Sequence, residues 1–89
     1  MSGGFQDADK GAKDVQDAAK FAMQKKFPGR AVSFEIIDAL KQPVQGFIYD
    51  LTMDVTDKAS SLCSSHQYLV YKPFNAGYTL KESTDLGDC

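Results

Sequence analysis

The stretch Phe47-Ile48-Tyr49-Asp50-Leu51-Thr52-Met53-Asp54-Val55 (residues 47–55) changes polarity at almost every step. Its odd-numbered positions are all apolar, whereas three of its four even-numbered positions are polar. A period of two is that of a β-strand with one buried face. The stretch therefore predicts a strand whose odd-numbered side chains pack on a hydrophobic core.

A second strand precedes this one at hairpin distance. Apolar and polar residues alternate between Val32 and Ile36, so we predict a strand from Val32 to about Lys41. The five residues Gln42-Pro43-Val44-Gln45-Gly46 separate the two runs. A connection this short favours a β-hairpin with an exposed loop at residues 42–46.

Closer to the N-terminus the period becomes that of a helix. In the segment that opens at about Lys10, apolar residues recur three and four positions apart, and they are Val15, Ala18, Ala19, Ala22 and Met23. Pro28-Gly29 ends this segment, because proline cannot continue a helix. The stripe is mostly alanine, so we expect the helix to lie close to a sheet that wraps around it. Residues 1–8 show no period and predict a flexible N-terminal arm.

The C-terminal third predicts a second hairpin. A polar link from Thr56 to Ser61 leads to a predicted strand at about Ser65 to Lys72. The segment from Pro73 to Gly77 ends this strand, and apolar and polar residues alternate again from Tyr78 to Lys81. One helix followed by about four antiparallel strands predicts a single α+β domain over residues 1–89, with the helix packed on one face of the sheet.

Composition excludes several classes of function. The 89 residues carry a formal charge of -2, and their ten basic residues form no stripe with interleaved aromatic residues, so we expect no nucleic-acid partner. No apolar run approaches the ~20 residues that span a bilayer, and Met1-Ser2-Gly3-Gly4 lacks the apolar stretch of a signal peptide. We therefore expect no membrane association, and either a cytosolic protein or a mature secreted domain without its leader.

Three motifs carry a resemblance to a known family. Gln42 to Gly46 fits the pattern Gln-x-Val-x-Gly, Gly3-Gly4 stands ahead of Phe21-Ala22-Met23, and Pro73-Phe74 lies in the second hairpin. The chain resembles the cystatin superfamily of cysteine-protease inhibitors, which carries these motifs at similar places, with Pro-Trp in the second hairpin. Phe74 keeps an aromatic face there but lacks the indole N–H.

This resemblance implies reversible, tight-binding inhibition of papain-like cysteine proteases such as cathepsin L-like enzymes. The arm and the two hairpin loops would occlude the active-site cleft without any chemistry of the chain, and without a cofactor. The implied protease-binding residues are Gly3, Gly4, Gln42, Pro43, Val44, Gln45, Gly46, Pro73 and Phe74. We expect a monomer, with a domain-swapped dimer as the alternative if Val44 is held in a strained conformation.

The pairing of the two cysteines indicates the compartment in which the protein is found. Many secreted cystatins have an insertion with its own disulfide after the second strand, but here Thr56 to Leu62 connects directly, which leaves Cys63 and Cys89. They lie on opposite limbs of the predicted second hairpin, so we expect a disulfide between them and a secreted protein. If they are unpaired, the protein is cytoplasmic.

Two other kinds of function deserve comparison with inhibition. Cys63 and His66 could form a thiol nucleophile with its base, and together with Cys89 they could be zinc ligands, but neither set has the spacing that such a site needs. We therefore predict neither an enzyme nor a metal site. The remaining alternative is a cystatin-fold interaction module without protease inhibition, because a fold alone does not settle a function.

Overall fold

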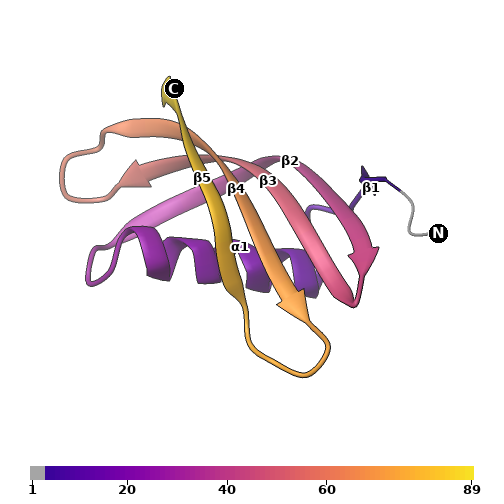
Figure 1. Ribbon diagram of the computed structural model, residues 1–89. Coiled ribbons are helices and arrows are strands. Elements are labelled where there is room, and N and C mark those ends of the chain that lie inside the picture. The colour runs from indigo at the N-terminus through magenta and orange to yellow at the C-terminus, as the bar shows by residue number, and fades with distance from the viewer. Residues whose placement is uncertain (1–3) are drawn as a thin grey trace.

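The computed structural model describes residues 4–89. Its elements, in chain order, are β1 (Gln6–Asp7), α1 (Lys13–Lys26), β2 (Val32–Val44), β3 (Gly46–Asp57), β4 (Cys63–Pro73) and β5 (Thr79–Asp88). The strands form one antiparallel sheet in the order β1-β2-β3-β4-β5, and the sheet curves around α1 (Figure 1). This arrangement confirms the predicted helix on a wrapped sheet.

The helix packs through the stripe that the sequence predicts. Its buried residues are Val15, Ala18, Ala19, Ala22 and Met23. It begins at Lys13 rather than at Lys10, because the Asp9 carboxylate accepts the backbone N–H of Gly11 at 2.8 Å and forms a turn ahead of it. The helix is 14 residues long, and residues 4–89 hold no helix with the length and hydropathy that a membrane crossing requires.

The core lies between this stripe and the concave face of the sheet. The predicted strand at 47–55 points Tyr49, Leu51, Met53 and Val55 inward, each at most 2% exposed. The neighbouring strands add Ile36, Ala39, Tyr68 and Val70. Four of the five odd-numbered positions of the predicted strand are therefore fully buried, and Phe47 packs against the edge of the core.

A β-bulge in β2 breaks the alternation that the sequence shows there. The register shifts between Ile36 and Asp38, so Ile37 is the extra residue and is 43% exposed. Such a bulge bends a strand and increases its twist. It therefore helps β2 to follow the curvature of the sheet around α1.

The sheet has five strands, not about four. Gln6 and Asp7, within the predicted flexible arm, pair with Lys41 and Leu40 of β2, and the Ala8 N–H donates to the Ala39 carbonyl at 2.9 Å. The pairing gives hydrogen-bond partners to backbone groups on the edge of β2 and so stabilises the sheet. Side-chain patterns do not reveal this contribution, because it comes from the backbone.

The first hairpin loop is shorter than predicted, whereas the second has the predicted length. Val44 pairs with Gly46, so most of the segment 42–46, predicted as a loop, belongs to the strands and only Gln45 lies between them. In the second hairpin β4 spans Cys63–Pro73 and β5 spans Thr79–Asp88, which leaves a loop at 74–78. Both strands continue further at their outer ends than predicted, to Cys63 and to Asp88. Backbone pairing continues through polar residues, because the ladder needs no apolar side chains.

Candidate functional site

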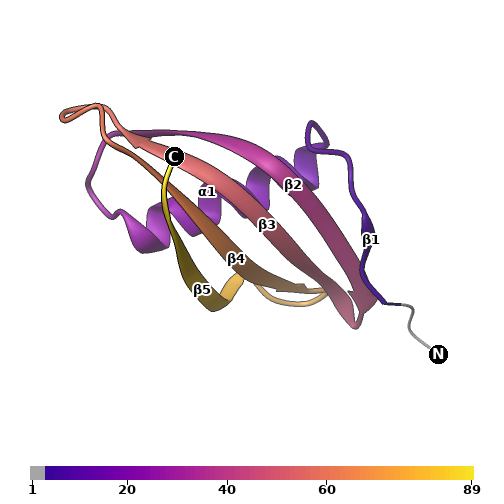
Figure 2. The ribbon, with the colours of Figure 1, turned by 90° about the horizontal axis from the view of Figure 1, so that it is seen from above.

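The two hairpin tips lie side by side at one end of the molecule. Gly46, at the first tip, pairs directly with Pro73, where the second begins. The arm reaches the same end, because β1 runs along the last part of β2 (Figure 2). The molecule measures 45 × 23 × 21 Å, so this is a narrow end of an elongated body. We call the described residues 4–6, 41–49 and 71–81 the tip region.

The first tip exposes Pro43, Val44 and Gln45. The side chain of Val44 is 37% exposed although it is apolar. Gln42 lies earlier on β2, half-buried and paired with Ile48. The Tyr71 hydroxyl donates a hydrogen bond to the Gln45 carbonyl at 3.1 Å, which connects the tip to β4.

Gly46 is the position of this tip that only glycine can occupy. Its φ is +121°, a value that residues other than glycine rarely adopt. Among residues 4–89, Ser61 is the only non-glycine residue with a positive φ. A Cβ on Gly46 would lie 2.7 Å from the Pro73 Cα, and the Lys72 carbonyl oxygen would be closer still. Only glycine fits this conformation and this approach. Val44, where the domain-swapping hypothesis assumed strain, does not have a positive φ.

The second tip presents an aromatic side chain. Phe74 is 68% exposed and packs edge-to-face on Phe47, with 6.4 Å between ring centroids. Between the two tips is a shallow hollow, lined by Gln45, Tyr71, Pro73, Phe74, Asn75 and Ala76. The residues predicted on the two hairpins are therefore neighbours in space.

The arm contributes a residue that the sequence analysis missed. Gly3 lies outside the described residues, and Gly4 is exposed. A Cβ added to Gly4 would have no described atom within 4 Å. Phe5, directly before β1, is 40% exposed. The available signal was an aromatic residue immediately after a glycine pair in an otherwise polar arm.

A small polar network supports the tip region from the helix. The Asp14 carboxylate accepts hydrogen bonds from the Tyr49 hydroxyl at 2.9 Å and from Lys41 Nζ at 3.2 Å. The same ammonium lies 4.8 Å from the centroid of Phe47, a cation–π distance. Partial burial acts to raise the pKa of Asp14, but the two hydrogen bonds and the charge of Lys41 together outweigh it, so this pKa lies below its usual value.

Cys63 and Cys89 form the predicted disulfide, with 5.4 Å between their Cα atoms. Neither sulfur is therefore available as a nucleophile or a zinc ligand. His66 Nε2 is hydrogen-bonded to the Ser64 hydroxyl at 2.7 Å, and its ring stacks on Tyr68. The Cys63–His66 pair considered from the sequence thus has no free thiol.

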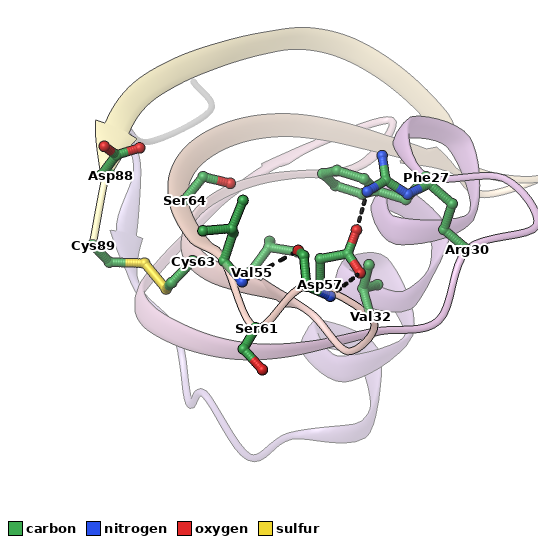
Figure 3. A pocket seen from close by; sticks show the side chains of 12 residues that line it. Phe27, Arg30, Val32, Val55, Asp57, Ser61, Cys63, Ser64, Asp88 and Cys89 are labelled. Carbon is green, nitrogen blue, oxygen red and sulfur yellow. Dashed lines mark hydrogen bonds and ion pairs between the residues drawn. A yellow bond between two sulfur atoms is a disulfide. The ribbon is translucent and has the colours of Figure 1, made fainter.

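A second hollow lies away from the tip region, between the end of α1 and the disulfide (Figure 3). Phe27, Val32 and Val55 form apolar walls, and Arg30 and Asp57 form an ion pair at its side. Because these two charges satisfy each other, they do not point to a charged ligand. Of the residues that line this hollow, Leu62 is the strongly exposed apolar side chain, whereas three separate segments each expose one in the tip region. The tip region is therefore the stronger candidate site.

No protein-family model matches the sequence, and no curated protein matches it. Among solved structures, the chain is similar to a salivary cystatin from the soft tick Ornithodoros moubata, with a TM-score of 0.71 and 17% sequence identity. The similarity covers 96% of this chain and 98% of the tick chain. At this identity the comparison establishes the arrangement of helix and sheet. The chain therefore has the cystatin fold, as its sequence motifs predict.

Proposed function

We propose that the chain is a reversible, tight-binding protein inhibitor of papain-like cysteine proteases, with cathepsin L-like enzymes as targets. The observation that carries this proposal is that three segments each expose an apolar side chain at one narrow end of the molecule. Phe5 is 40%, Val44 37% and Phe74 68% exposed. Exposed apolar side chains gathered on one surface are typical of a binding site.

Inhibition would be steric. The arm and the two tips would enter the active-site cleft together and exclude water and substrate from the catalytic cysteine. The first tip is held by its β-ladder and by the Tyr71 hydrogen bond to Gln45, so it loses little conformational entropy on binding. A standard interface of roughly 800 Å² per partner would then suffice for high affinity.

We also propose that the protein acts as a secreted monomer, as a single domain over residues 1–89. The Cys63–Cys89 disulfide supports secretion, because disulfides persist mainly in oxidising compartments. The similar tick cystatin is a salivary protein, which agrees with this compartment.

Val44→Asp tests the function directly. The aspartate would be desolvated in the cleft, which costs several kcal/mol. Inhibition of a cathepsin L-like enzyme, followed with a fluorogenic peptide substrate, should weaken at least about 100-fold. Ile37→Asp is the matched control, since Ile37 is 43% exposed on the β2 bulge outside the tip region. It should leave inhibition unchanged.

The outcomes separate the hypotheses. If the wild-type protein does not inhibit at micromolar concentration, the proposed function is wrong and the cystatin-fold interaction module is favoured. If Val44→Asp inhibits as well as wild type, the first tip has no role in binding. Removing residues 1–4 in the same assay measures the contribution of the part of the arm that precedes Phe5.

A further inference from the structure

Charge is distributed unevenly between the tip region and the remainder of the chain. The tip region contains Lys41, Lys72 and Lys81 and no acidic residue, and Asp7, Asp50 and Glu82 follow directly after its three segments. The other residues hold seven of the ten basic side chains and all twelve acidic ones, a formal charge of -5. The end that we assign to protease binding is therefore positive on an acidic protein.

Two of the three lysines keep their charge uncompensated. Lys41 pairs with Asp14 at 3.2 Å, so the helix neutralises it in part. In residues 4–89, by contrast, no carboxylate lies within 4.0 Å of the ammonium of Lys72 or Lys81. The free positive charge of the tip region thus resides on β4 and β5.

Both of these ammonium groups are held beside the tips. Lys72 Nζ donates a hydrogen bond to the Pro73 carbonyl at 2.8 Å, which keeps the charge at the second tip. Lys81 Nζ lies 5.5 Å from the centroid of Tyr71, whose hydroxyl binds the first tip. Tyr71 also lines the hollow between the tips. The two charges therefore flank the surface that would enter a cleft.

We propose that Lys72 and Lys81 make the inhibitor selective for papain-type proteases whose cleft rim is acidic. This inference rests on the proposed function and names the partner. Complementary charge raises the association rate by steering the encounter, typically 10- to 1,000-fold, and like charge suppresses a wrong partner. The acidic remainder of the inhibitor would be repelled by such a protease, so productive approach would occur with the tips first.

The test measures association rates by stopped-flow inhibition of two papain-type proteases, one with an acidic and one with a basic cleft rim, at about 10 mM and 500 mM salt. The variant Lys72→Glu/Lys81→Glu reverses the charge of the tip region. Lys25→Glu/Lys26→Glu is the matched control, because it makes the same change in net charge at the exposed end of α1, opposite the tips (Figure 1). Circular dichroism verifies that each variant is folded. If the Lys72 substitution unfolds the chain, the single variant Lys81→Glu is measured instead.

With the acidic-rim protease at low salt, Lys72→Glu/Lys81→Glu should associate at least about 10-fold more slowly than wild type. The association rate of the control variant should fall by less than about 3-fold. The difference should vanish at high salt, where charges are screened within about 4 Å. Equal effects of the two variants, or faster wild-type association with the basic-rim protease, would overturn the selectivity while leaving inhibition intact. Absence of wild-type inhibition of both proteases would refute the proposed function itself.

Discussion

Gly46→Ala is the substitution for which the structure makes the sharpest stability prediction. The methyl group would meet backbone atoms of β4 rather than a flexible side chain, at 2.7 Å from the Pro73 Cα and 2.9 Å from the Lys72 carbonyl carbon. No rotamer change relieves such a contact. Either the two strands separate at the tips, or the alanine abandons the φ of +121°.

Two contributions set the size of the effect. A non-glycine residue at positive φ costs about 1 to 2 kcal/mol. Separating β3 from β4 near Gly46 would lose one or two ladder hydrogen bonds, at about 1 kcal/mol each. We therefore expect Gly46→Ala to lower the free energy of unfolding by about 2 to 4 kcal/mol, a large share of the stability of a domain of this size.

Gly87 provides the matched control. Its φ is +101°, but no described atom lies within 4 Å of the Cβ that an alanine would add. Gly87→Ala should therefore show only the backbone term of about 1 to 2 kcal/mol. Urea unfolding followed by circular dichroism measures both variants, with unchanged m values as the condition for comparing them. A loss for Gly46→Ala no greater than that for Gly87→Ala would refute the steric argument.

Further predictions concern two tyrosine hydroxyls of the core and the Asp14 carboxylate. The Tyr68 hydroxyl is buried, burial raises its pKa to about 12, and it has no hydrogen-bond partner in residues 4–89. Tyr68→Phe should thus raise the free energy of unfolding by about 1 kcal/mol. Tyr49→Phe, which removes one of the two side-chain donors to Asp14, should lower it by a similar amount, about 1 kcal/mol. A lower free energy of unfolding in both variants would contradict the argument. Because the native pKa of Asp14 is lowered, its stabilising contribution is complete above the ordinary carboxyl pKa of about 4 and disappears as pH falls through the lower native value. The melting temperatures of wild type and Asp14→Asn should therefore differ most near pH 7 and converge near pH 2, and a difference independent of pH would contradict this.

Much of the architecture could be predicted from local patterns. The alanine-rich stripe of α1 and the alternation in 47–55 identified the buried faces, because burial selects apolar side chains with the period of the element. The Cys63–Cys89 pairing was also expected, since a hairpin brings its two limbs together. The motif at 42–46 led to the first tip, although its length as a loop was overestimated.

Long-range backbone contacts account for what the patterns missed. Pairing of Gln6 with Lys41 creates β1 and brings Phe5 to the tip region, and the bulge at Ile37 reverses the faces of β2. Neither depends on side-chain polarity, so neither has a periodic signal. The pairing of Gly46 with Pro73 likewise comes from the register of β3 and β4, and it explains why the motif needs glycine at that position. Local sequence specifies which residues are buried, whereas register and curvature specify which exposed residues meet.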